Sequence, residues 1–489
     1  MALPTPEFPE YVKPEVTNVI NTSFNEKVFN PIAYGRYFEI IFNEQALFRN
    51  QLLRSRALVP SSGIRALFSE QTGSYYARIP IYGRIGTEKE SDAPVNYDGM
   101  TDIDRAKTFT YERGVTCFGR AKAWFELDFT YDITMGIDFL SYTAQQIAFY
   151  WERQDIKTLY AIMNALFKKK EIPTTTPVEQ EPAIHWNEFV EYHTYDTTRI
   201  QIEDLLVNQF STISLATVDV GTLGTEVQTR LADAELKKTF KDSIKLGVET
   251  LNNAIQRASG DNKNIFTLVI APSIIGTILE NKQLLEYFKY NDAMGIQRSL
   301  NMGSWNGRTV LLDDELLSES LNLATPLEET YVMDVYNTTD SKTYSVTFSI
   351  KSSRASIPFL VLGQGMFEYE MLDVKTPWEM FREPLTNGGV STLISRRRLL
   401  YAPKGFSYTP NNQVTLSPTN EELGNELNWE LVRSAKPYII YNKDGQTVKE
   451  THYDFYAHRN IPLLKVLVGD NSRGLEDLTI KVTKVQEKT

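Results

Sequence analysis

The sequence is poor in the residues that most often carry chemistry. It has one cysteine, Cys117, and four histidines among 489 residues. A single cysteine cannot form a disulfide within the chain or supply a cysteine-based zinc site. No run approaches the roughly twenty apolar residues of a membrane-spanning helix. The opening MALPTPEFPEYVKPE also lacks the basic and apolar regions of a secretory signal. These absences favour a cytosolic-type protein.

Composition and charge further limit the class of protein to which the chain can belong. Hydrophobic residues make up 42% of the chain and charged residues 23%, which is typical of a folded protein rather than a disordered one. The chain is longer than one small core needs, so we expect two or three lobes. With 51 basic and 62 acidic side chains, the net charge of −11 argues against wrapping nucleic acid over a broad surface.

The motifs that would indicate an enzyme are missing. His185 and His193 lie in HWNEFVEYH, but their eight-residue spacing is not that of a zinc motif, so we predict a solvated amphipathic segment. Glycine pairs at 221–224 and 363–365 lack the remaining residues of a phosphate-binding loop and indicate turns. Cys117 has no histidine nearby in the sequence. We therefore predict no catalytic, metal-binding or cofactor-binding residues, and no cofactor.

The first sixty residues are rich in proline, at positions 4, 6, 9, 14, 31 and 60. Proline fixes φ and removes a hydrogen-bond donor, so this region is predicted to be an extended arm with at most short helices, such as one over 36–53. Such an arm gains little from its own contacts. It would have to lie along its own body or along a neighbour.

Residues 74–127 indicate two strands around a polar middle. Segments 74–82 and 107–113 have the aromatic and β-branched content of strands. Between them, 87–104 carries six carboxylates and one lysine, and it cannot fold inward without burying unpaired charge. The pattern predicts a two-stranded ribbon with an acidic tip, which needs an external surface because an isolated ribbon is marginal in water. A long surface loop on an ordinary enzyme is the alternative.

The strongest helix signal covers 138–167. Leu140, Ala144, Ile147, Trp151 and Leu159 recur at three- and four-residue steps or their multiples. At ~1.5 Å per residue the helix would be roughly 45 Å long, which suits a structural spine.

The rest of the chain mixes helices and strands, so the predicted fold class is α+β. A Pro/Thr-rich linker is expected over 170–180. A hairpin over 296–312 should turn at Trp305-Asn306-Gly307, because Asn-Gly supplies the left-handed backbone angles of such a turn. Further helices are predicted over 232–258 and 273–290, and strands over 265–270, 330–350, 359–372, 438–441 and 463–468.

Basic residues cluster in two places, at Arg396–Arg398 and on one helical face through Lys237, Lys241 and Lys245. A nucleic-acid interpretation lacks the interleaved aromatic residues that stack bases. A solvated face, or ion pairing with an acidic partner such as the 87–104 tip of another copy, is the alternative, and such charges set register more than affinity. The residues predicted to contact other copies are Arg84, Glu88, Lys89, Glu90, Asp92, Asp102, Asp104, Arg105, Lys237, Lys241, Arg396, Arg397 and Arg398.

The order of these parts resembles the major capsid proteins of tailed bacteriophages with the Hong Kong 97-like fold. The resemblance spans about 120–430. It is carried by an ordered set of segments, each weak alone: WFELDFT (124–130), IDFL (137–140), AFYWERQ (148–154), GRTVLLDD (307–314), LGQGMFEY (362–369) and SPTNEEL (417–423). The large chain and its aromatic content are similar to those of crAss-like phages.

The resemblance implies a domain plan. It comprises an N-terminal arm (1–73), an extended β-ribbon called the E-loop (74–127), the spine helix of the peripheral domain (128–170), an insertion (171–232), an axial domain (233–400) with a second insertion (314–345), and a C-terminal part (401–489) returning to the peripheral domain.

The resemblance also implies a structural role without enzymatic activity. Hexamers and pentamers of the chain would close an icosahedral shell around double-stranded DNA, which they touch only weakly and non-specifically. Further partners would be portal, scaffolding and auxiliary or head-fibre proteins, with no membrane contact. The protein would be located in the virion capsid and assembled in the cytoplasm of the bacterial host.

Two other readings stay open. An encapsulin-type shell that holds enzyme cargo would share the architecture, although the two insertions favour the phage. An unrelated carbohydrate-active enzyme would instead need a pocket with convergent carboxylates of shifted pKa.

Overall fold

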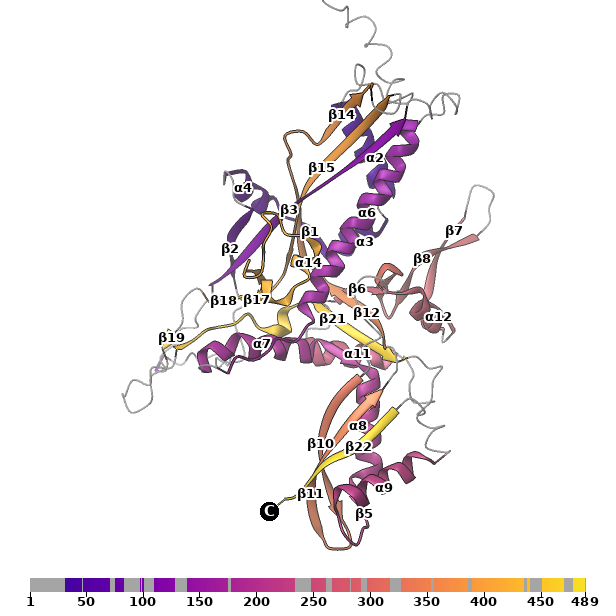
Figure 1. Cartoon of the computed structure of the whole chain (residues 1–489), viewed down its shortest axis with the longest axis vertical. Coiled ribbons are helices and arrows are strands. Elements are labelled where there is room, and N and C mark those ends of the chain that lie inside the picture. Colours follow the sequence, from indigo (N-terminus) through magenta and orange to yellow (C-terminus); the bar gives the residue numbers. More distant parts are fainter. Residues whose placement is uncertain are drawn as a thin grey trace, which may run out of the picture. The chain divides into compact units, whose positions relative to one another are not determined.

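The computed structural model divides the chain into two compact units (Figure 1). The first unit consists of Met1–Asn187 and Gln364–Ile461, and the second of Glu188–Gly363 and Pro462–Thr489. Both contain helices and sheets, so the predicted α+β class is confirmed. The domain boundaries predicted from the sequence stay predictions. The structure describes residues 31–45, 47–70, 75–82, 97, 99–100, 110–127, 139–174, 177–233, 248–260, 266–281, 283–291, 297–316, 327–352, 356–385, 389–434, 438–439, 451–469 and 478–488.

The first unit is built on a seven-stranded sheet in the order β1-β13-β15-β3-β18, with β14 also paired to β15 and β2 to β3. The β1–β13 pair is parallel, and the other pairs are antiparallel. The strands are β1 (Leu58–Pro60), β2 (Tyr76–Tyr82), β3 (Thr110–Leu127), β13 (Phe367–Leu372), β14 (Trp378–Glu383), β15 (Val390–Pro403) and β18 (Arg433–Ser434).

Strand β3 is 18 residues long and pairs with two different strands along its length. Its first part pairs with β2 from Thr110↔Tyr82 to Thr116↔Tyr76. The next part pairs with β15 as far as Leu127↔Val390. The base of the predicted ribbon is therefore present and continuous with the main sheet. The acidic tip over 87–104 lies outside the described residues, apart from Tyr97, Gly99 and Met100.

Helix α6 (Phe139–Leu166) confirms the predicted spine helix. Its apolar stripe packs against α2 (Pro31–Gln45), where Ala144, Ile147 and Trp151 share a buried cluster with Tyr34 and other α2 residues. Short helices follow α2 along the chain, namely α3 (Leu47–Arg54) and α4 (Ser62–Glu70).

The described part of the predicted arm is therefore mostly helical and not extended, and the short helix expected over 36–53 is confirmed by α2 and α3. Residues 31–45, 47–54 and 62–70 form helices, and α2 lies along α6 of the same chain. Aromatic residues explain why this segment is helical. Tyr34, Phe38 and Phe42 recur every four residues, so a helix places all three on one face, and burying that face is more favourable than leaving the side chains on an extended chain. Residues 1–30 lie outside the described residues.

The described residues of the second unit form two sheets. The larger has the order β4-β21-β12-β6-β9-β8-β7, and α11 and α12 share its core cluster. The smaller has the order β22-β11-β10-β5, and α8 and α9 share its core cluster. The bounds are β4 (Thr194–Asp196), α8 (Thr197–Phe210), β5 (Thr212–Ile213), α9 (Val220–Leu231), α11 (Val248–Ser259), β6 (Phe266–Ala271), α12 (Ser273–Asn281), β7 (Glu286–Asn291), β8 (Gln297–Trp305), β9 (Arg308–Leu312), β10 (Leu327–Asn337), β11 (Lys342–Ser352), β12 (Ser356–Gly363), β21 (Leu463–Gly469) and β22 (Leu478–Glu487).

Several local predictions can be compared with these elements. The hairpin turn is confirmed, since Asn306 and Gly307 have φ of 49° and 74° between paired β8 and β9. The helix predicted over 273–290 was wrong in its second half. Gln283 adopts a φ of 58°, which ends the helical run, and the aromatic-rich 286–291 then pairs as a strand. Within 232–258, residues 234–247 lie outside the described part.

The histidine-containing segment was also mispredicted. It belongs to helix α7 (Pro177–Tyr192), and Trp186, Phe189 and His193 are fully buried rather than solvated. His193 Nδ1 lies 2.6 Å from the carbonyl oxygen of Leu463, so it is a core histidine that bonds the backbone. No helix in the described part is long and apolar enough to cross a membrane.

The remaining elements are short. They are β16 (Phe406–Tyr408), α14 (Asn420–Leu423), η2 (Glu426–Asn428), β17 (Trp429–Leu431), β19 (Tyr438–Ile439), β20 (Thr451–His452) and η3 (His458–Asn460).

Candidate functional site

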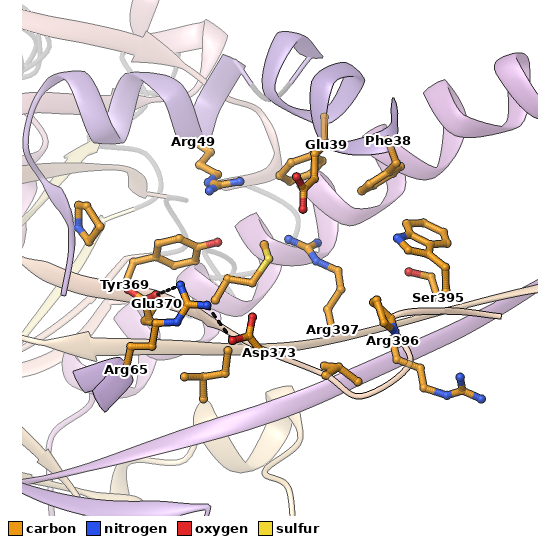
Figure 2. A pocket seen from close by; sticks show the side chains of 17 residues that line it. Phe38, Glu39, Arg49, Arg65, Tyr369, Glu370, Asp373, Ser395, Arg396 and Arg397 are labelled. Atoms are coloured by element: carbon orange, nitrogen blue, oxygen red, sulfur yellow. Dashed lines mark hydrogen bonds and ion pairs between the residues drawn. The ribbon is translucent and has the colours of Figure 1, made fainter. Parts of the chain in front are cut away.

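The arginine run on β15 borders a pocket of about 480 Å³ in the first unit (Figure 2). Helices α2 and α3 contribute Phe38, Phe42 and Arg49 to its lining. Strands β13 and β15 contribute Tyr369 and Arg397, among others, so the pocket lies between helices and sheet. In Figure 2, Arg49 enters from the helical side, whereas Arg397 rises from the strand.

Arg397 is directed inward by the alternation of β15, whose residues are alternately buried and half-buried from Val390 to Arg398. Its side chain is 7% exposed, and Nη2 donates to Asp155 Oδ2 on α6 over 3.2 Å. The guanidinium also lies over the rings of Phe42 and Trp151, at 4.9 and 5.2 Å from their centroids. Arg397 therefore links the sheet to the spine helix within one chain.

Asp155 is as buried as its partner, with 8% of its side chain exposed. Burial raises the pKa of this carboxyl, and the nearby Arg397 and Arg49 oppose the rise. The position was visible in the sequence as a charged residue four places after Trp151, on the apolar stripe of α6. We did not predict its role, because the partner lies 242 residues away.

Arg49 is the second guanidinium of the inner end. It lies 5.3 Å from the centroid of Phe42 and 5.0 Å from that of Tyr369. Within the described part of the chain, no carboxylate forms an ion pair with it. The buried guanidinium of Arg397 and the half-buried guanidinium of Arg49 thus lie near a single buried carboxylate, that of Asp155.

The outer end of the pocket is different. Arg65 of α4 is exposed and pairs with Asp373 at 2.7 Å and with Glu370 at 3.7 Å. Hydrogen bonding to Asp373 raises the pKa of Arg65. These groups pair with one another in contact with water, and the two carboxylates outnumber the one guanidinium.

The two other arginines of the run have separate partners. Arg396 is partly exposed and donates to Glu379 on β14 over 2.7 Å. Arg398 lies 3.7 Å from the sulfur of Cys117 and over the ring of Tyr75. Since consecutive strand residues point to opposite faces, the run does not form one basic patch. The other predicted contact residues, Arg84, Glu88, Lys89, Glu90, Asp92, Asp102, Asp104, Arg105, Lys237 and Lys241, lie outside the described residues.

The pocket is lined by guanidinium and hydroxyl groups together with the carboxylates of Glu39, Glu370 and Asp373. Cys117 lies elsewhere in the sheet and is fully buried, and burial raises the pKa of its thiol, which disfavours the reactive thiolate. Among the described residues, no group of three or more histidine, cysteine or carboxylate side chains could hold a metal ion.

The sequence is similar to a phage structural protein over part of its length. It is 23% identical to the major capsid protein of Bacillus phage SPP1 over 181 residues, which are 37% of this chain and 45% of that relative. The chain thus spans less than half the length of the curated relative that it matches. No family model matches the sequence.

Solved phage capsids are also similar to the chain. The cyanophage Pam1 capsid asymmetric unit has 8% identity and a TM-score of 0.36, with 83% of this chain and 87% of that one covered. The capsid of Ralstonia phage GP4 has 7% identity and a TM-score of 0.35, with 72% and 86% covered.

Proposed function

We propose that the chain is the major capsid protein of a tailed bacteriophage with the Hong Kong 97-like fold. Copies would assemble into hexamers and pentamers of an icosahedral shell that encloses double-stranded DNA. The observation that carries the proposal is the 181-residue similarity to a phage major capsid protein. The long helix α6 and the ribbon base formed by β2 and β3 are in the order expected for that family. A relation to crAss-like phages stays a prediction.

The proposal assigns the protein a structural role without enzymatic activity, in the virion capsid after assembly in the host cytoplasm. Portal, scaffolding and auxiliary or head-fibre proteins would be its partners, together with packaged DNA held by weak non-specific contact. The net charge of −11 supports weak DNA contact, because phosphates are repelled rather than neutralised.

The decisive experiment is to express the full-length chain and image the product by negative stain after size-exclusion chromatography. We expect closed shells or ring-shaped capsomers. A stable monomer under all conditions would contradict the proposal and favour an unrelated enzyme. Shells that hold protein cargo and no nuclease-protected DNA, when isolated from infected cells, would favour an encapsulin-type compartment instead.

The acidic segment 87–104 is proposed to contact neighbouring copies, together with the nearby Arg84 and Arg105. An E88Q/E90Q/D92N variant tests this, because it removes three charges while keeping side-chain size. We expect slower or incomplete assembly and an unchanged unfolding midpoint of the unassembled chain. E421Q, an exposed acidic residue on α14, is the matched control. Assembly of the triple variant at the wild-type rate would contradict the proposed contact.

A further inference from the structure

The inner end of the β15 pocket contains buried hydrogen-bonding atoms to which no described residue of the chain is bonded. Arg49 Nε, Arg397 Nη1, the Tyr369 hydroxyl and Ser395 Oγ are all buried, and none has a hydrogen-bond partner in the described structure. All four residues line the same pocket. Buried polar groups in folded proteins are nearly always partnered, so four such atoms at one cavity call for an explanation.

These atoms are also chemically alike. The two guanidinium nitrogens can only donate, and the two hydroxyl groups can donate as well as accept. Three of the residues are well buried. Taken over the whole residue, the exposed fraction is 0% for Ser395, 5% for Tyr369 and 8% for Arg397. These donors come from β13, β15 and α3 and line one pocket, which suits a group that accepts hydrogen bonds.

The charges at the inner end of the pocket indicate that the accepting group is negatively charged. Arg397 and Arg49 both act on Asp155, and Arg397 alone is bonded to it. Among the described residues, one of these two positive charges therefore has no carboxylate partner, and the apolar side chains of Phe42 and Trp378 line the pocket beside it. Glu39 also lines the pocket, but it is exposed and makes no ion pair within the described chain.

We propose that the inner end of this pocket binds an oxyanion of the carboxylate or phosphate class, held by Arg49, Arg397, Tyr369 and Ser395. The oxyanion would supply the missing negative charge and accept from the unused donors. Two sources share this chemistry: a free inorganic phosphate ion, and an acidic side chain of a second copy, for which the 87–104 segment is the densest source in the sequence. Binding of free phosphate does not depend on shell formation, whereas the second source rests on the proposed assembly of copies.

The test uses the full-length chain with inorganic phosphate as the probe. Thermal unfolding is followed as sodium phosphate replaces sodium chloride at constant ionic strength and pH. We expect the unfolding midpoint to rise in proportion to the logarithm of the phosphate concentration once that concentration exceeds the dissociation constant. The absence of any rise beyond the chloride control, together with no binding of the peptide described below, would overturn the proposal.

Two variants locate the site without disturbing packing. Tyr369→Phe and Ser395→Ala each remove one oxygen, so both should fold. We expect the phosphate dissociation constant to rise about tenfold in the double variant, as for the loss of hydrogen bonds to a charged group. Arg65→Gln, at the outer end, is the matched control and should bind phosphate like the wild type. A phosphate response that is the same in the double variant and the wild type would overturn the assignment to this pocket.

A fluorescent peptide of residues 87–104 separates the two sources. Binding of the peptide, with competition by phosphate and loss in the double variant, identifies an acidic side chain of another copy as the occupant. Phosphate binding without peptide binding identifies a free ion. Peptide binding that phosphate and the double variant leave unchanged would place the peptide elsewhere, and it would count against the proposal.

Discussion

Arg397 of β15 and Asp155 of α6 form a buried ion pair at 3.2 Å between the sheet and the spine helix of the first unit. Burying both charges removes their solvation by water. The attraction between the two charges offsets this loss only while both residues are present. The pair therefore specifies how the helix is placed on the sheet more than it adds to stability.

Breaking this pair should be costly. Asp155→Leu leaves Arg397 buried without its carboxylate, and we expect a loss of about 3–5 kcal/mol in the free energy of unfolding. The double variant D155L/R397M should recover much of that loss, because no unpaired charge remains. Chemical denaturation of the four proteins in the cycle measures the coupling.

The neighbouring Arg396 is the control for this cycle. Its pair with Glu379 is partly exposed, so Arg396→Met should cost less than about 1 kcal/mol. Equal losses from Asp155→Leu and Arg396→Met would show that burial does not govern these pairs.

Glu422 of α14 should make stability depend on acid pH. Its carboxylate accepts from the Thr415 hydroxyl and from the backbone N–H groups of Val414, Thr415 and Thr419, and these bonds lower its pKa from 4.5 to about 2. A lowered folded-state pKa stabilises the protein above about pH 4.5, and the contribution is lost as pH falls towards 2.

The Glu422→Gln variant should therefore unfold at a lower temperature than the wild type at pH 7. The gap between their midpoints should narrow between about pH 5 and pH 2. Thermal unfolding monitored by circular dichroism over this range is the measurement. A gap that stays constant with pH would rule out the linkage.

Lys170 should titrate near neutral pH. Burial lowers its pKa to about 8, although Glu430 and Glu426 oppose the shift. The side chain lies 4.3 Å from the centroid of the Trp186 ring and donates to the carbonyl of Trp429. Its amine should therefore be acylated faster around pH 8 than that of a model lysine peptide, whose pKa is about 10.4.

Labelling followed by peptide mass spectrometry gives the rate at each pH. Glu430→Gln removes a carboxylate that favours the charged amine, so it should lower the midpoint of the labelling curve further. A midpoint near that of the model peptide, or a rise in the variant, would contradict the assignment.

Gly114 should be intolerant of a side chain at the base of the ribbon. A Cβ at this position of β3 would collide with the Tyr76 hydroxyl and with the backbone oxygen of Tyr408. Gly114→Ala should cost about 1–3 kcal/mol, because β2, β3 and β16 must separate to admit it. Gly63→Ala is the control, since nothing lies within 4 Å of its Cβ and alanine favours helix α4 by about 0.5–1 kcal/mol. Similar unfolding midpoints for the two variants would refute this account.

The sequence by itself determined the elements whose signal is local and periodic. The stripe through Ala144, Ile147 and Trp151 predicted α6, and the backbone preference of Asn306-Gly307 predicted the turn between β8 and β9. The succession of helix-like and strand-like segments likewise predicted the α+β class. These signals come from neighbours within a few residues, so no tertiary contact is needed to read them.

Only the tertiary structure decided the rest. It placed helix α2 of the arm on the protein's own spine helix and turned Arg397 inward while Arg396 stayed partly exposed. It also brought Arg49 and Tyr369, 320 positions apart in the numbering, to one pocket. The physical reason is that charge, burial and unused hydrogen bonds depend on partners distant in sequence, and the periodicity of a single strand or helix does not identify those partners.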